Sequence, residues 1–287
     1  MPEVADIITP KKILLNGLLF GFAKARRGFI LVHGLSSSLF SKLKLVEELA
    51  KVGPVLTFNN RGHDKVTRIQ KLDTRSKKGY RSIQAGGAHE VFAECTDDLT
   101  GAVNFMKKRG VREIILVGHS TGCQKIVYYL AKTQVKIKGA VLLCPMSDYA
   151  GAVKEYGTAK LKAVGKLARR LVKSKQAHRL LPLDLWPEYD DAQRFLSLCT
   201  AKSKENLFPY DGSAKPTVLK KIKNPCLVVL AEKDEYRDRP IKQIAVWFQK
   251  NSGNPKSETI IVSKSLHSLQ GQEGPVVSQI RKWISLI

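Results

Sequence analysis

The chain has 287 residues, and 43% of them are hydrophobic, enough for the core of one domain with an insertion. No apolar run approaches the roughly 20 residues that span a bilayer, and the start Met1-Pro2-Glu3 does not resemble a secretory signal. The net charge of +24 would attract nucleic acid, an anionic membrane or acidic substrates, yet no nucleic-acid-binding motif accompanies it, so we expect a solvated basic surface.

The five cysteines are odd in number and widely spaced, which favours buried thiols in the reducing cytoplasm over a disulfide framework. No Cys-x-x-Cys or His-x-x-x-His pair indicates a metal, and no glycine-rich phosphate loop indicates a nucleotide. We therefore expect neither a metal nor a cofactor.

The N-terminal third shows several element signals. Two apolar runs around Asn16-Gly17 predict a β-hairpin over residues 12–22, followed by a basic loop over 24–27. Further patterns predict a strand over 28–32, a helix over 41–51 and a strand over 55–58.

The next stretch, residues 65–87, has no clear periodicity and is dense in Lys and Arg. It is typical of a mobile basic loop, which we expect at the same edge of the sheet as Ser120. Apolar spacing then predicts a helix from Ala88 to Arg109, with Gly110 as its C-terminal cap.

The central motif is Gly118-His119-Ser120-Thr121-Gly122. It follows a β-branched run over 113–117, which predicts a buried strand, and precedes a helical pattern over 123–130. Gly-x-Ser-x-Gly between a strand and a helix is the nucleophile-elbow pattern, in which the serine hydroxyl is exposed on a strained turn. An ordinary tight turn is the alternative.

After the elbow helix, residues 137–145 predict another buried strand, and the strand–helix alternation then stops. Residues 149–221 are mostly helical in pattern and predict a cap inserted between core segments 1–148 and 222–287; the alternative is an amphipathic segment that docks on anionic membrane. The last segment predicts strands over 226–230 and 259–262 and helices over 241–249 and 275–286. We expect an α/β fold with a mainly parallel sheet flanked by helices.

Three residues form a candidate catalytic triad. A serine nucleophile needs a base to take its proton and a carboxylate to orient that base. Ser120, Asp234 and His267 follow three predicted strands in the order serine, acid, base, so their loops meet at the carboxyl edge of the sheet. Asp148 is the alternative acid.

The loop after residues 28–32 is a candidate oxyanion site. A glycine at this point, Gly34, allows a backbone amide to face the site, and the amide of Leu35 is the best candidate. We expect His33 to hold this loop by hydrogen bonding. Gly34 and His119 are candidate substrate-binding residues.

These motifs resemble those of serine hydrolases of the α/β-hydrolase superfamily over nearly the whole chain. The residues 58–64 (FNNRGHD) and 118–124 (GHSTGCQ) are similar to a group that includes fungal siderophore esterases. The resemblance implies ester or amide hydrolysis through an acyl-serine intermediate. By carry-over Ser120 attacks, His267 relays protons, Asp234 orients His267, and the amides of Leu35 and Thr121 hold the oxyanion.

The expected partner is a small-molecule ester. The basic residues of the 65–81 stretch and of the predicted cap suggest anionic esters. Two other classes remain open: a ligand-binding or scaffold protein of the same fold, and a basic protein that binds membrane or nucleic acid electrostatically.

Overall fold

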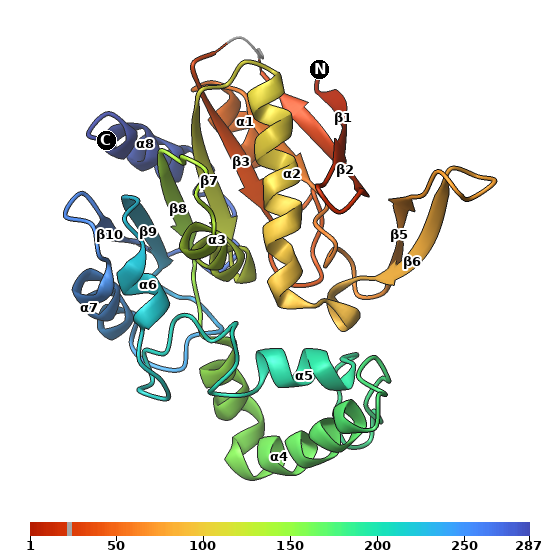
Figure 1. Cartoon of the computed structure of the whole chain (residues 1–287). Helices are drawn as coiled ribbons and strands as arrows, with labels where there is room; N and C mark the ends of the chain where they lie inside the picture. The colour runs from red at the N-terminus through yellow and green to blue at the C-terminus, as the bar shows by residue number, and fades with distance from the viewer. Residues whose placement is uncertain (22–24) are drawn as a thin grey trace.

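The computed structural model describes residues 1–21 and 25–287 (Figure 1). Phe22, at the end of the expected hairpin, and Lys24, at the start of the expected basic loop, lie outside the described residues.

Ten strands form one sheet within the described residues, in the order β10-β9-β8-β7-β3-β4-β2-β5-β6, with β1 paired to β2. Neighbouring strands from β10 to β4 in this sheet order are parallel. The pairs that involve β1, β2, β5 and β6 are antiparallel. The strands are β1 (Glu3–Ile8), β2 (Ile13–Phe20), β3 (Arg27–Val32), β4 (Val55–Phe58), β5 (Thr67–Leu72), β6 (Tyr80–Ala85), β7 (Glu113–His119), β8 (Gly139–Leu143), β9 (Cys226–Ala231) and β10 (Glu258–Val262).

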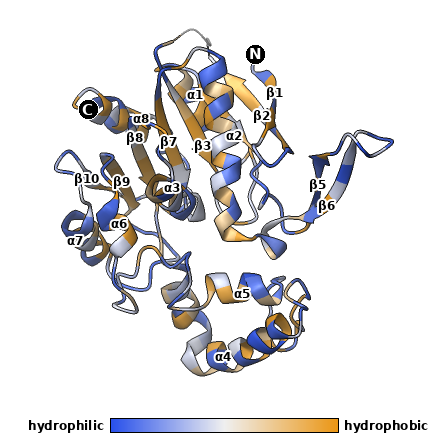
Figure 2. Cartoon of the chain, viewed as in Figure 1, coloured by the Kyte–Doolittle hydropathy of each residue, from blue (hydrophilic) through white to orange (hydrophobic). Residues whose placement is uncertain are grey.

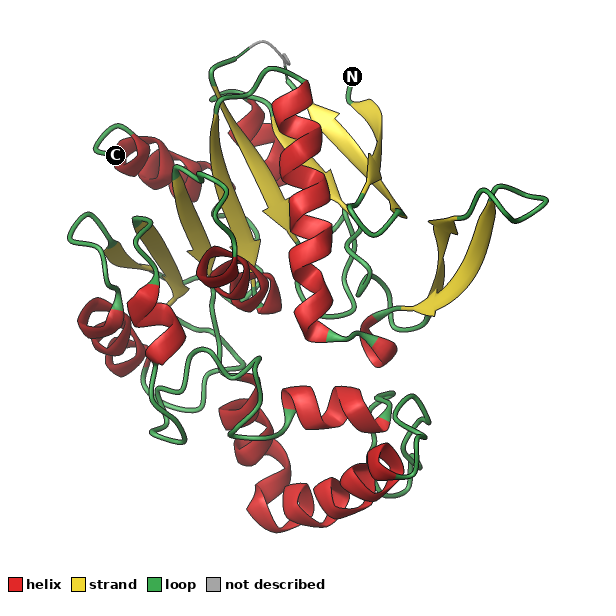
Figure 3. Ribbon diagram, viewed as in Figure 1, coloured by secondary structure: helices red, strands yellow, loops and turns green. Residues whose placement is uncertain are grey.

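Helices cover both faces of this sheet (Figure 3). One apolar core lies beneath α1 (Leu43–Ala50) and α8 (Glu273–Ile284). The other lies beneath α2 (Cys95–Lys108), α3 (Thr121–Lys132), α6 (Thr217–Lys221) and α7 (Ile241–Asn251). The architecture is therefore the expected α/β sandwich with a mainly parallel sheet.

Burial explains why the sequence pattern predicts the central strands. Every residue of β4, β8 and β9 is buried, as expected for parallel strands covered on both faces, and Figure 2 shows the hydrophobic colour gathered on the sheet. In contrast, β1 alternates exposed Asp6 with buried Ala5 and Ile7, because only one face of this edge strand meets the core. Strand β1 is not among the strands that the sequence predicts.

The hairpin predicted around Asn16-Gly17 is wrong in its turn. Strand β2 runs straight through both residues, and the reversal lies between Ile8 and Ile13, where β1 meets β2. Gly17 serves a close approach instead: a Cβ there would lie 2.8 Å from the carbonyl oxygen of Thr57 in the neighbouring β4. In the sequence, a glycine that permits close contact between two strands is therefore indistinguishable from the glycine of an Asn-Gly turn.

The mobile basic loop expected over residues 65–87 is also wrong. Strands β5 and β6 form an antiparallel hairpin that extends away from the sheet in Figure 1, and β6 is the last strand in the sheet order. Half of their residues are exposed and only Ile69 and Ala85 are buried, so neither strand shows the apolar alternation that identifies a half-buried strand.

The helix expected from Ala88 begins later, at Cys95. Two short 3₁₀ turns, η1 (Gly87–His89) and η2 (Phe92–Glu94), replace its first third, and Glu90 between them is extended. The predicted cap at Gly110 is confirmed, because this residue has φ +87° directly after the C-terminal end of α2.

Residues 148–221 hold α4 (Asp148–Lys173), kinked at Gly157, α5 (Ala192–Leu198) and α6. Helices α4 and α5 share an apolar cluster separate from the two sheet cores and lie beyond the carboxyl ends of β3 and β7 in Figure 1. Among the described residues, no helix is long and apolar enough to cross a membrane.

Candidate active site

Ser120 stands on a sharp turn between β7 and α3. Its backbone has φ 54° and ψ −126°, a conformation that a non-glycine residue adopts only where its surroundings enforce it. A Cβ on Gly118 would lie 2.8 Å from the amide nitrogen of Cys123, and one on Gly122 would lie 2.2 Å from the carbonyl oxygen of Val32. Both glycines are therefore required by the turn, as in a nucleophile elbow.

The loop after β3 lies against Ser120. A Cβ on Gly34 would lie 3.0 Å from the Cβ of Ser120, so only glycine permits this approach. The next amide, of Leu35, and the amide of Thr121 at the start of α3 donate no hydrogen bond within the described ranges 1–21 and 25–287. These are the two amides expected to face an oxyanion.

The candidate base and acid are paired. His267 Nδ1 lies 2.8 Å from Asp234 Oδ2, and Asp234 is completely buried. The amide of Tyr236 donates to the other carboxylate oxygen of Asp234, and Glu235 accepts a hydrogen bond from the His267 amide. With Asp234 accepting from Nδ1–H, the Nε2 of His267 can accept a proton.

The alternative acid, Asp148, lies elsewhere. Its carboxylate accepts a hydrogen bond of 2.7 Å from Gln124 Nε2, at the start of α4. Burial, followed by the charge of Glu205, raises the pKa of Asp148 to about 7. The carboxylate beside His267 is therefore that of Asp234.

His119 connects the elbow to the loop of His267. Its Nε2–H donates to the carbonyl oxygen of His267 over 2.9 Å, and the two rings lie 5.0 Å apart. Burial, followed by the positive charge of Lys42, lowers the pKa of His119 to about 3, so the ring is neutral. A cavity of about 260 Å³ adjoins His119, but its lining includes neither Ser120 nor His267.

The Ser120 hydroxyl makes no hydrogen bond within the part of the chain that the structure describes. In substrate-free sites the bond between nucleophile and base is often long and tightens only when substrate binds. The hydrogen bond from His119 to the carbonyl oxygen of His267 joins the elbow to the loop of His267.

His33 holds the loop after β3, as expected. Its Nδ1–H donates to the carbonyl oxygen of Gly34 over 2.8 Å, and its Nε2 accepts from the Asn60 amide over 3.2 Å. Burial lowers the pKa of His33 to about 3, so this hydrogen-bond pattern stays fixed over the working pH range.

A buried ionic network beneath the site was not predicted. Lys125 of the elbow helix pairs with Glu90 at 2.6 Å, and Glu90 lies 3.2 Å from Arg194 of α5, which also pairs with Glu205. All four side chains are almost fully buried. Lys125 also donates to Asn60, so the network joins α5, the elbow helix and the residue that holds His33.

The sequence contained one signal for this network. Lys125 lies between Cys123 and Ile126 on a helix whose neighbouring positions are buried, where a charged residue needs a partner. Nothing in the local pattern identified Glu90 and Arg194 as its partners.

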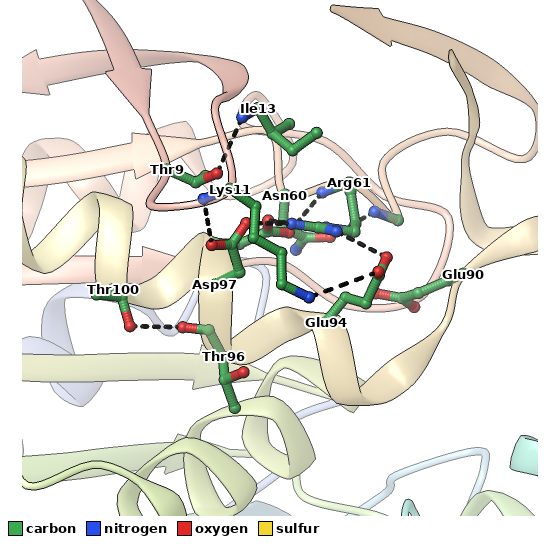
Figure 4. A network of polar contacts seen from close by, with 12 residues as sticks. Thr9, Lys11, Ile13, Asn60, Arg61, Glu90, Glu94, Thr96, Asp97 and Thr100 are labelled. Carbon is green, nitrogen blue, oxygen red and sulfur yellow. Dashed lines mark hydrogen bonds and ion pairs between the residues drawn. The ribbon is translucent and has the colours of Figure 1, made fainter. Parts of the chain in front are cut away.

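Arg61 explains much of the motif at residues 58–64. Its guanidinium pairs with Glu94, Asp97 and Asp98 at the start of α2, as Figure 4 shows for the labelled Arg61, Glu94 and Asp97. The neighbouring Gly62 leaves room for Glu90, because a Cβ there would lie 2.5 Å from the Glu90 carboxylate. Residues 58–64 therefore belong to the structure that supports the site, through the ion pairs of Arg61 and the close approach of Gly62 to Glu90.

Several solved structures share this fold. The esterase Pf2001 of Pyrococcus furiosus has a TM-score of 0.64 at 19% identity, over 100% of this chain and 91% of that one. The siderophore hydrolase EstB of Aspergillus fumigatus has a TM-score of 0.67 at 17% identity, over 99% and 98%. The α/β hydrolase GrgF of Penicillium sp. sh18 has a TM-score of 0.67 at 15% identity, over 100% and 98%.

These similarities confirm the expected α/β-hydrolase fold. No curated protein matches the chain in sequence. Residues 87–284, well over half of the chain, match the model of a family described as "Protein of unknown function (DUF1749)". The chain thus has the α/β-hydrolase fold and belongs to the DUF1749 family.

Proposed function

We propose that this protein hydrolyses carboxylic esters through an acyl-enzyme on Ser120. The observation that carries the proposal is the strained Ser120 turn, with two unengaged amides beside it and the His267–Asp234 pair on adjoining loops. The fold shared with named esterases is consistent with this chemistry, although it does not itself define a reaction.

Each residue has a distinct role in the proposed reaction. His267 Nε2 takes the proton of the Ser120 hydroxyl as its oxygen attacks the ester carbonyl, and Asp234 stabilises the imidazolium. The amides of Leu35 and Thr121 donate to the oxyanion of the tetrahedral intermediate. His267 then protonates the leaving alcohol, and water releases the acid in a second cycle of the same steps.

We further propose that residues 149–221 act as a cap over this site. The apolar cluster between α4 and α5 packs against Leu35, directly beside the proposed oxyanion site, and Tyr149 and Val153 belong to the same contact. A cap in this position excludes water and offers an apolar surface to the substrate.

The proposed partner is a small ester, with a preference for anionic substrates. The net charge of +24 creates a positive field that raises the encounter rate of anions. The five cysteines are free and buried, which supports a location in the reducing cytoplasm.

Pre-steady-state hydrolysis of p-nitrophenyl butyrate tests the reaction. We expect a burst of about one equivalent of p-nitrophenol followed by slower turnover, because p-nitrophenolate is a good leaving group and acylation is therefore faster than deacylation. The Ser120→Ala variant should lose the burst, whereas Ser285→Ala, an exposed serine at the end of α8, should keep it. A folded wild-type protein that binds ester without releasing p-nitrophenol would instead identify a ligand-binding protein.

A further inference from the structure

Two histidines and an aspartate meet at the junction of the sheet domain and the α4–α5 segment. His89 ends the η1 turn beside the sheet, His178 follows α4, and Asp191 caps the start of α5. One ligand atom from each lies within 4.8 Å of the other two. These residues are far apart in sequence, so a spacing motif could not reveal them.

Asp191 is a buried carboxylate without a permanent cation. It is 0% exposed, and its ion-pair partners in the described residues are the two histidines. Its Oδ1 accepts the amide of Arg194, while both imidazoles converge on Oδ2. Burying a carboxylate is unfavourable unless positive charge or several hydrogen bonds compensate it. A bound cation at Oδ2 would supply that charge.

The ligand spacing fits a small transition-metal ion. Asp191 Oδ2 lies 3.1 Å from His89 Nδ1 and 2.8 Å from His178 Nδ1. In a tetrahedral zinc site with bonds of about 2.0–2.1 Å, neighbouring ligand atoms are roughly 3.3 Å apart. Shifts of a few tenths of an ångström would therefore admit the ion in place of the two Nδ1 protons.

The outer contacts also suit a ligand set. The amide nitrogen of Gln84 lies 2.7 Å from His89 Nε2, and a flip of this side-chain amide would let its oxygen accept the Nε2–H of a metal-bound imidazole. His178 keeps 58% of its side chain exposed, which leaves a solvent route and room for water as a fourth ligand.

We propose that His89, His178 and Asp191 bind a Zn²⁺ ion. The ion would join the η1 turn to the α4–α5 segment, beside the hydrogen bond from the Asp191 amide to Ala88. It would thereby hold the proposed cap against the sheet domain. Since the site includes neither Ser120 nor His267, binding does not depend on the proposed esterase reaction.

Calorimetric titration of tag-free, EDTA-stripped protein with ZnCl₂ at pH 7.5 tests this proposal. We expect one equivalent to bind and the melting temperature to rise, because the ion binds only the folded state. His178→Ala removes a direct ligand and should weaken zinc binding at least about 100-fold. Mutating a residue that only hydrogen-bonds a metal ligand already lowers metal affinity by about 10- to 100-fold. Arg179→Ala, an exposed neighbour, is the matched control and should bind as the wild type does.

One competing cluster must be separated in the same experiment. Cys144, Asp234 and His267 also place ligand atoms within 4.8 Å of one another. We expect His267→Ala to retain zinc binding. Loss of zinc binding in His267→Ala but not in His178→Ala would assign the ion to that cluster and overturn the proposal. A wild type that binds no zinc at about 100 µM, taken as the upper limit of specific binding, would overturn it as well.

Discussion

Ser120 and its immediate neighbours carry most of the proposed chemistry. The positive φ of Ser120 is enforced by contacts at Gly118, Gly122 and Gly34, each of which leaves no room for a Cβ. Such strain persists only where surrounding packing compensates it, and in the proposed reaction the amides of Leu35 and Thr121 stabilise the oxyanion that forms beside Ser120.

The orientation of His267 depends on Asp234. Replacing Asp234 with Asn should lower kcat/KM by about 10³–10⁴-fold, because the amide favours the wrong imidazole tautomer and cannot stabilise the imidazolium. Hydrolysis of p-nitrophenyl butyrate measures this effect. Glu232→Gln, in the same loop but exposed, should change kcat/KM by less than about threefold. Equal losses in both variants would contradict the assignment.

Asp148 should make stability depend on pH. Its folded pKa of about 7 exceeds the roughly 3.9 of an unfolded aspartate, so its stabilising contribution is present below about pH 4 and is lost as the pH rises through 7. Asp148→Asn stays neutral. Its free energy of unfolding, relative to the wild type, should therefore rise by on the order of 3 kcal/mol from pH 4 to pH 8.

Urea unfolding at several pH values measures this difference. Asp184→Asn, an exposed aspartate in the same segment, provides the control and should show a difference that does not vary with pH. A flat profile for Asp148→Asn would mean that the Asp148 carboxylate is not held protonated by burial.

At the scale of elements, buried ions join α5 to the elbow helix. Removing Arg194 would leave Glu90 and Glu205 buried without their shared partner. Arg194→Met should therefore lower the free energy of unfolding by about 3–5 kcal/mol. Arg170→Met, on the exposed face of α4, should lower it by less than about 0.5 kcal/mol. Urea unfolding compares the two, and equal effects would show that the network does not stabilise the fold.

The elements that sequence reasoning recovered are those with a strong local pattern. The central strands are continuously apolar, and α3, α7 and α8 repeat apolar positions at helical spacing, so local chemistry and tertiary structure agree. The β5–β6 hairpin lacks such a pattern because few of its residues are buried in the core. Gly17 misled because a close contact with β4 and a tight turn demand the same residue.

The same limit applies to the candidate site. The loops of Ser120, Asp234 and His267 were identified because each follows its own apolar strand, and the structure brings Asp234 and His267 together. The partners of Lys125 were not identified, because pairing with Glu90 and Arg194 depends on how α5 packs over the sheet domain. Long-range packing of this kind leaves little trace in local sequence.

At the scale of the whole molecule, the exposed cations of the β5–β6 hairpin and of α4 differ from Lys42, which lines the cavity beside His119. The cations of the β5–β6 hairpin lie at the far end of the sheet order, and those of α4 are mostly exposed. We propose that these cations act on anionic substrates through the long-range field, which salt screens over about 10 Å at 0.1 M.

This account predicts a salt-dependent preference. Raising NaCl from about 10 mM to 500 mM should lower kcat/KM for a p-nitrophenyl ester with a succinyl group by about tenfold and leave that for the neutral butyryl ester nearly unchanged. Steady-state hydrolysis at fixed pH measures both substrates. Equal values for the two esters at low salt, or parallel salt profiles, would contradict an anionic preference.

The central claim is that Ser120 is the nucleophile, and labelling with a fluorophosphonate probe tests it most directly. The account predicts covalent labelling of the wild type and of Ser285→Ala, and none of Ser120→Ala, with the modified peptide containing residues 118–122. Labelling that persists in Ser120→Ala, or a wild type that the probe does not modify, would contradict the proposed mechanism.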